Sequence, residues 1–112
     1  MKKLILASVV LWSLTSRAEG VLEPLLGFMH DQNGIVFQVF SGGCTSKQSF
    51  TIENKVRNKT NLVSLVRTRP DYCKAFFFFG TYVEFSYEEL GVNRGQSFEI
   101  QNSVVGSARP KF

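Results

Sequence analysis

The sequence predicts an all-β fold, a small antiparallel β-sandwich or barrel of five or six strands with one disulfide and at most one short helical turn. Three observations carry this prediction. Short runs of β-branched and aromatic residues recur along the chain, turn signals separate them about every 8 to 12 residues, and one segment alone has the pattern of a helical turn. Small sandwiches and barrels share this layout.

Strand patterns recur in five places after the N-terminal region. Residues 34–40 are β-branched or aromatic on both faces, whereas 49–56 and 97–102 alternate apolar and polar side chains with period two. The expected strands are 34–40, 49–56, 62–69, 75–85 and 97–102. Residues 21–28 form either another strand or a short irregular piece, because Pro24 interrupts them.

The breaks between these runs have recognisable turn chemistry. Residues 31–34 read DQNG and 57–61 read RNKTN, and Pro70 ends the strand at 62–69. Ser86, Glu89 and Gly91 have the spacing of a capped helical turn, with serine as the N-cap and glycine at its end.

The first 18 residues have the layout of a cleaved secretory signal peptide. Lys2 and Lys3 precede the uncharged apolar run 4–14, and Ser16 and Ala18 are small residues suited to a cut after Ala18. The apolar run has 11 residues, whereas a membrane-spanning helix needs about 20. We therefore expect a leader of bacterial style and a periplasmic or secreted product, with no membrane span in the mature chain.

Removing the leader changes the charge balance. The chain has 13 Lys and Arg against 9 Asp and Glu, but Lys2, Lys3 and Arg17 belong to the leader. This leaves 10 basic against 9 acidic side chains, whose signs alternate along the chain. Nucleic-acid binding requires clustered cations and is not expected. The mature chain should form one domain over 19–105, followed by a loose tail over 106–112.

The two cysteines, Cys44 and Cys73, predict a disulfide. In an oxidising compartment an even number of cysteines indicates pairing, and closing this 29-residue loop stabilises a small domain by about 3 to 4 kcal/mol. Gly42 and Gly43 should form a tight turn that aims Cys44 at its partner. The chain lacks Cys-x-x-Cys spacing and has one histidine, so we expect neither a redox motif, a metal nor a cofactor.

Four consecutive phenylalanines, 76–79, lie inside the expected strand 75–85. Successive strand side chains point to opposite faces, so a half-exposed strand would leave two rings in water. Burying each ring stabilises the fold by about 1.5 to 3 kcal/mol, which favours a core position with both faces covered. The alternative is an exposed patch that binds a partner. The run is too short to span a membrane.

Catalytic groups are scarce, and we expect no enzyme. The single histidine, His30, lies beside a predicted turn, which favours a surface residue over a general base. Glu88 and Glu89 are adjacent, so they diverge on a helical turn instead of facing each other across a cleft as glycosidase carboxylates do.

Arg67, Arg69 and Tyr72 are the candidate binding residues. The two arginines are two positions apart, so they should share a strand face, where either could pair with Asp71, Glu53 or Glu84 in a solvated charge ladder. The alternative is a recognition patch of the two arginines and Tyr72, since arginine and tyrosine are frequent at the centres of interfaces.

These observations predict a small secreted or periplasmic domain that is not an enzyme and binds a protein or envelope component. The alternative is an inhibitor of a secreted hydrolase such as a protease or lysozyme, and the second alternative is a small enzyme of uncharacterised type. The domain resembles small secreted bacterial β-domains with one disulfide only in its general architecture.

Overall fold

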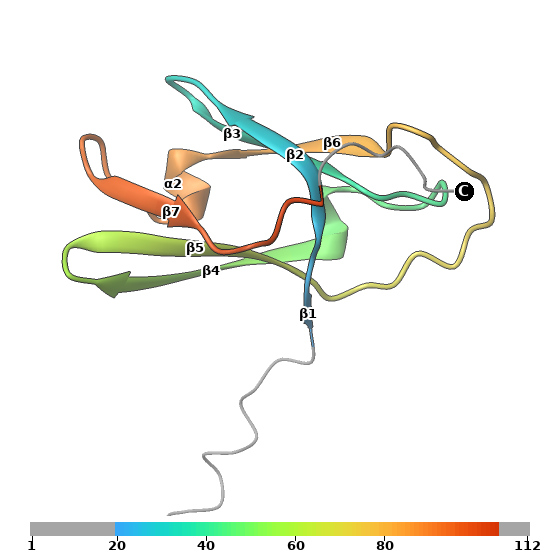
Figure 1. Cartoon of the computed structure of the whole chain (residues 1–112), viewed down its shortest axis with the longest axis horizontal. Coiled ribbons are helices and arrows are strands. Elements are labelled where there is room, and N and C mark those ends of the chain that lie inside the picture. Colours follow the sequence, from blue (N-terminus) through green and yellow to red (C-terminus); the bar gives the residue numbers. More distant parts are fainter. Residues whose placement is uncertain (1–19, 106–112) are drawn as a thin grey trace, which may run out of the picture.

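The computed structural model describes residues 20–105, which form two facing β-sheets (Figure 1). One sheet has the order β2-β3-β6, and the other has the order β1-β5-β4, with β7 also paired to β5. The strands are β1 (Val21–Leu22), β2 (Leu25–His30), β3 (Gly34–Val39), β4 (Phe50–Arg57), β5 (Thr60–Arg67), β6 (Thr81–Ser86) and β7 (Ser97–Ile100). The predicted leader 1–18 and tail 106–112 lie outside the described residues.

The core lies between the two sheets. Its fully buried side chains include Ile35, Phe37 and Val39 from β3, and Val63 and Leu65 from β5. Each set alternates along its strand, so the period-two pattern in the sequence maps directly onto the inner faces. The predicted all-β fold is confirmed, and it consists of two antiparallel-rich sheets with seven strands in the described residues, against the five or six expected.

Turn chemistry sets the two hairpin turns where the sequence predicts them, whereas β5 spans Thr60–Arg67 instead of the expected 62–69 and ends before Pro70. Asp31 Oδ1 accepts from the N–H groups of Asn33 and Gly34 at the β2–β3 turn, 2.7 and 3.1 Å away. Asn58 and Lys59 both have positive φ between β4 and β5, which gives the two-residue hairpin turn that matches strand twist. Pro24 separates β1 from β2 and so divides the N-terminal segment between the two sheets.

Two short helical elements occur within residues 20–105. A 3-10 turn, η3 (Lys47–Ser49), precedes β4, and α2 (Tyr87–Leu90) follows β6. The predicted cap at α2 is confirmed: Ser86 Oγ accepts from Glu89 N–H, Glu89 Oε1 accepts from Ser86 N–H, and Gly91 ends the turn with φ +79°. No helix within 20–105 has the length and apolarity to cross a membrane.

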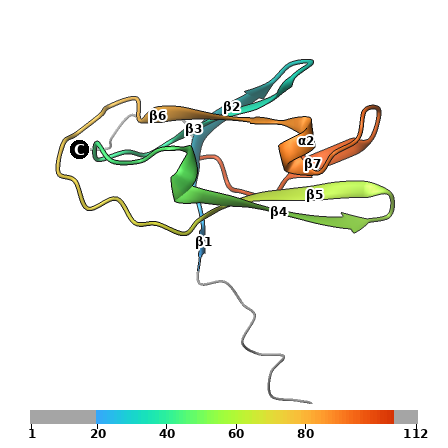
Figure 2. The ribbon, with the colours of Figure 1, turned by 180° about the vertical axis from the view of Figure 1, so that it is seen from behind.

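Strand β7 departs from the expected antiparallel arrangement. It runs parallel to β5, from the pair Thr60–Ser97 to the pair Val63–Ile100. The chain leaves one sheet at Ser86, turns through α2 and joins the other sheet (Figure 2). Alternation does locate the strand, with Phe98 and Ile100 packed against the core, but it carries no information on the direction of a partner.

The predicted strand 75–85 is wrong in its first half, and so is the core position of the four phenylalanines. β6 begins at Thr81, and the rings of Phe76, Phe77, Phe78 and Phe79 are 76%, 48%, 42% and 64% exposed. The partner strand is the reason. β3 ends at Val39, opposite Thr81, so the residues before Thr81 have no ladder to join.

Candidate functional site: an aromatic loop held by a disulfide and a carboxylate

The candidate site is the segment 72–80, here called the aromatic loop. It belongs to the connection from β5 to β6, which passes from one sheet to the other around one end of the domain (Figures 1 and 2, yellow). The hairpin turns β2–β3 and β4–β5 lie at the opposite end. The loop thus closes one end of the sandwich, and its backbone forms neither strand nor helix.

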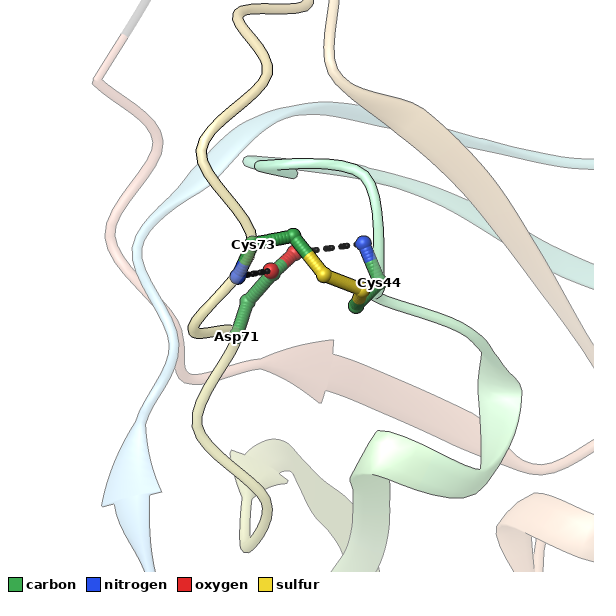
Figure 3. A group of neighbouring side chains, drawn as sticks. All are labelled: Cys44, Asp71 and Cys73. Carbon is green, nitrogen blue, oxygen red and sulfur yellow. Dashed lines mark hydrogen bonds between the residues drawn. A yellow bond between two sulfur atoms is a disulfide. The ribbon is translucent and has the colours of Figure 1, made fainter.

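The base of the loop is joined covalently to the β3–β4 connection. Cys44 and Cys73 form the predicted disulfide, with their Cα atoms 5.7 Å apart (Figure 3). Gly42 is required beside it, because a Cβ at this position would lie 2.5 Å from the Cys73 carbonyl oxygen. The SGGC stretch is thus a close-packed turn that presents Cys44 to Cys73, as predicted.

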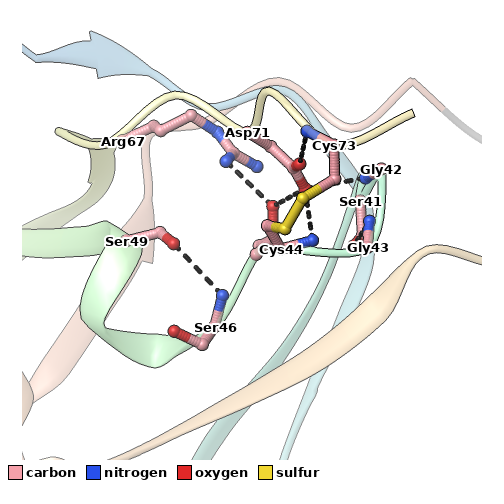
Figure 4. Close-up of a disulfide and its surroundings, with 10 residues drawn as sticks. Ser41, Gly42, Gly43, Cys44, Ser46, Ser49, Arg67, Asp71 and Cys73 are labelled. Carbon is pink, nitrogen blue, oxygen red and sulfur yellow. Dashed lines mark hydrogen bonds between the residues drawn. A yellow bond between two sulfur atoms is a disulfide. The ribbon is translucent and has the colours of Figure 1, made fainter. Parts of the chain in front are cut away.

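A carboxylate makes a second connection at the same place. Asp71 Oδ2 accepts from the hydroxyl of Thr45 at 2.7 Å and from the N–H groups of Gly42 and Cys44 at 2.7 and 3.1 Å, while Oδ1 accepts from Cys73 N–H at 2.9 Å (Figures 3 and 4). These four donors, the Thr45 hydroxyl foremost, hold the pKa of Asp71 far below its ordinary value. The ionised side chain therefore bridges the two connections.

Arg67 supports this region from β5. Its guanidinium forms a bidentate pair with the buried Glu23, with Nε–Oε1 at 2.9 Å and Nη2–Oε2 at 3.0 Å. Its other N–H groups donate to Thr45 Oγ1 and to the Phe40 and Arg69 carbonyl oxygens, and it lies over the ring of Phe50. All five donors are thus used inside the chain.

The structure separates the predicted binding residues. Arg67 ends β5 and faces inward, where its partner is Glu23 instead of Asp71, Glu53 or Glu84. Arg69 lies past the end of the strand and is exposed, and Tyr72 is 82% exposed at the start of the aromatic loop. A recognition role for Arg69 and Tyr72 stays a prediction. Glu23 has no distinguishing sequence signal besides its position before Pro24.

The rings of the aromatic loop form a cluster at the surface. The centroids of Phe76 and Phe78 are 6.2 Å apart and those of Phe78 and Phe79 are 4.9 Å apart, both in edge-to-face arrangement. Gly80, with φ +67°, closes the turn after them and donates its N–H to the Phe77 carbonyl oxygen at 2.9 Å. The rings therefore pack on one another while remaining accessible.

Other exposed apolar side chains lie at the same end. Phe40 follows β3, and Val104 and Val105 are tied to Leu25 by a parallel bridge and by a hydrogen bond from Val105 N–H to the Leu25 carbonyl oxygen. Leu25 pairs with Val39, which in turn pairs with the first residue of β6. These side chains enlarge the apolar surface around the aromatic loop.

A metal site at the disulfide is the next possibility. The sulfurs of Cys44 and Cys73 and a carboxylate oxygen of Asp71 lie within 4.8 Å of one another, the one such group of potential ligands in the described part of the chain. A metal would need the two thiolates that the disulfide consumes, and the carboxylate already accepts four hydrogen bonds. The group is therefore read as structural.

Two open grooves occupy the opposite end. The larger, about 840 Å³, is lined by the β2–β3 turn and the segment after α2, and the smaller, about 570 Å³, includes His30. The imidazole of His30 lies edge-on to the Phe98 ring at 5.7 Å, at the end of β2. The smaller groove is lined by Phe28, His30, Gln96, Ser97, Phe98, Glu99 and Ile100. No hydrogen bond joins the side chains of Ser97, His30 and Glu99 into a triad, and the Glu99 carboxylate accepts from Gln101 Nε2 instead.

Comparison with known proteins adds no further information, since no family model, curated protein or solved structure matches the chain.

Proposed function

We propose that this chain is a small secreted or periplasmic domain that is not an enzyme and binds a protein or envelope component through its aromatic loop. The observation that carries the proposal is the exposure of four consecutive phenylalanines in that loop. Large exposed apolar patches on small soluble domains mark interaction surfaces, because exposure to water has a free-energy cost that binding removes.

The way the loop is held supports this role. A flexible loop loses conformational entropy on binding, whereas a loop already held in place loses less. The disulfide, the Asp71 carboxylate and the Glu23–Arg67 pair all converge on the two connections at this end. The side chains of Asp71, Glu23 and Arg67 are thus used to hold the two connections in place. Arg69, Tyr72 and Lys74 remain as the polar rim around the aromatic loop.

The location of the protein outside the cytosol is inferred from the leader and the disulfide. A leader of this layout directs export, and disulfides persist in oxidising compartments. The single tryptophan, Trp12, lies within the predicted leader, so a cleaved product contains none. Mass spectrometry of the exported chain should give an N-terminus near Glu19; an intact N-terminus on the exported product contradicts cleavage.

The disulfide-held exposed loop also favours a second candidate, an inhibitor of a secreted hydrolase. An exposed loop fixed at its base can enter an active-site cleft without a large entropic cost. Dose-dependent loss of protease or lysozyme activity, abolished by Phe78→Ser, distinguishes this candidate from other binding roles.

The test of the proposed contact surface is site-specific crosslinking. A photoreactive phenylalanine analogue replaces Phe78 in one variant and, as a matched control, Val56, which is 67% exposed next to the β4–β5 turn at the opposite end. Each exported chain is irradiated in cells of the source organism, and the adducts are identified by mass spectrometry. We expect an identified protein or lipid adduct at 78 and none at 56. Equal adducts at both positions, or adducts only at 56, contradict the proposal.

A further inference from the structure

We propose that the partner of the aromatic loop is a phospholipid bilayer surface, with the rings of 76–79 entering the boundary between headgroups and acyl chains. This inference rests on the proposed function, since it names the chemistry that the loop contacts. It describes a domain that lies on a membrane at one end and does not span it.

The side chains at the loop tip point to hydrocarbon as the partner. Residues 75–80 are one alanine, four phenylalanines and one glycine, so their side chains offer no charge and no hydrogen-bonding group. Protein interfaces are also enriched in phenylalanine, but they typically have about one hydrogen bond per 100 to 200 Å², and the residues that contribute most to their affinity are tyrosine, tryptophan and arginine. A surface made of phenyl rings alone is therefore better suited to contact lipid hydrocarbon than a folded protein.

Four backbone groups at the tip have partners within the chain, whereas the N–H groups of residues 76–79 have none among the described residues. The Ala75 N–H donates to the Gly42 carbonyl oxygen at 2.9 Å, and the Gly80 N–H donates to the Phe77 carbonyl oxygen at 2.9 Å. The Phe79 carbonyl oxygen accepts from Gln38 Nε2 at 2.8 Å, across from β3. This limits how deeply the loop can enter a membrane, because backbone groups that lose water without a replacement partner carry a cost of several kcal/mol each. The phenyl rings therefore enter the boundary region while the backbone of residues 76–79 stays at the hydrated headgroup level.

The polar groups beside the tip have the charge and the chemistry of a membrane interface. Lys74 and Arg69 are exposed cations, and there is no Asp or Glu within 72–83. Asp71, the acid just before this stretch, directs its carboxylate at four internal donors. Cations favour anionic headgroups, and an exposed tyrosine such as Tyr72 suits the headgroup level.

The opposite end of the domain provides the contrast that makes the inference testable. Val56 is about as exposed as Phe79, but it lies beside the charged residues Lys55 and Arg57, next to the β4–β5 turn. A single tryptophan at either end therefore reports which end approaches lipid. Since Trp12 is the only tryptophan in the sequence, Trp12→Phe leaves the introduced residue as the sole probe whether or not the leader is retained.

The experiment compares Phe76→Trp with Val56→Trp, both combined with Trp12→Phe in the full exported chain. The probes are vesicles of phosphatidylcholine alone and of phosphatidylcholine mixed with phosphatidylglycerol, with and without bromine on the acyl chains. We expect the emission of Phe76→Trp to shift to shorter wavelength and to be quenched by brominated lipid, more strongly with phosphatidylglycerol. The emission of Val56→Trp should not change.

A binding measurement completes the test. In vesicle co-sedimentation, Phe76→Ser should weaken partitioning by about tenfold or more, since each buried ring is worth at least one such factor. Val56→Ser should leave partitioning unchanged. No spectral shift with either vesicle, or equal shifts at 76 and 56, overturns the lipid proposal.

The two proposals can fail separately. If the chain does not bind vesicles but position 78 still crosslinks to an identified protein, the lipid inference is wrong and the aromatic loop is a protein-binding surface. If the chain does not bind vesicles and position 78 gives no specific crosslink, both the lipid inference and the proposed function are wrong.

Discussion

Two segments rich in apolar side chains lie in opposite environments in this domain. β3 carries Phe37, which is fully buried against the rings of Phe28 and Phe85, whereas the aromatic loop carries four phenylalanines in contact with water. β3 has a hydrogen-bonded neighbour on each side, β2 and β6, and its inner face meets the other sheet. The loop has no strand partner. A segment of this domain is buried where neighbouring strands satisfy its backbone hydrogen bonds and a second sheet packs on its side chains. Hydrophobic side chains alone are not sufficient.

The largest expected effect tests this comparison directly. Phe37→Ala should lower the free energy of unfolding by about 3 to 5 kcal/mol, because it leaves a cavity in a closed core. Phe78→Ala should change it by no more than about 0.5 kcal/mol, as at other surface sites. Urea unfolding followed by circular dichroism measures both. A loss at Phe78 as large as that at Phe37 contradicts the assignment of the loop to the surface.

The second prediction concerns the covalent base of the loop. Replacing Cys44 and Cys73 together by alanine should lower the free energy of unfolding by about 3 to 4 kcal/mol, because the unfolded chain is no longer restricted by the 29-residue loop. Hydrogen exchange should rise in the loop at 72–80 before it rises in β3. Equal acceleration in both segments contradicts the view that the disulfide supports the loop in particular.

The third prediction concerns the ion pair behind the loop. Arg67→Ala should cost about 3 kcal/mol, at the lower end of the range for a broken buried pair, since the Arg67 side chain is 15% exposed. Arg69→Ala is the matched control and should change stability by no more than about 0.5 kcal/mol. Thermal unfolding of the two variants measures both losses of stability. Similar losses in both refute the distinction between an internal and an external arginine.

The smallest expected effect depends on pH. The folded-state pKa of Asp71 is depressed by the Thr45 hydroxyl and three backbone N–H groups, so its stabilising contribution is present above the ordinary value of 3.8 and is lost as pH falls below it. The stability difference between the wild type and Asp71→Asn should therefore narrow on acidification from neutral pH to about pH 2. Denaturant titrations across this range measure it, and a constant difference contradicts the role of the ionised carboxylate.

Acidification also affects Glu89, whose pKa is lowered by Lys47 and by the Ser86 N–H. This change is shared by the wild type and Asp71→Asn, so the difference between the two proteins isolates Asp71. The comparison is needed because both carboxylates lose their contribution in the same direction as pH falls.

The sequence alone determined those features that depend on neighbouring residues. Alternation located β4 and β7, the β-branched and aromatic run located β3, and the spacing of Ser86, Glu89 and Gly91 identified the cap of α2. The partners of the predicted disulfide were also determined, because two cysteines allow a single pairing. The strands and the cap depend on interactions between residues close in sequence. The disulfide has one possible pair of cysteines.

Only the tertiary structure decided the surface position of the aromatic loop, the Glu23–Arg67 pair and the parallel direction of β7. Phe76 and its neighbours have the propensity of a strand, but β3 ends before it can pair with them. Glu23 and Arg67 are 44 positions apart and meet because β1 pairs with β5. Such contacts depend on which segments the folded chain brings together, and the local pattern of apolar and polar residues does not predict this.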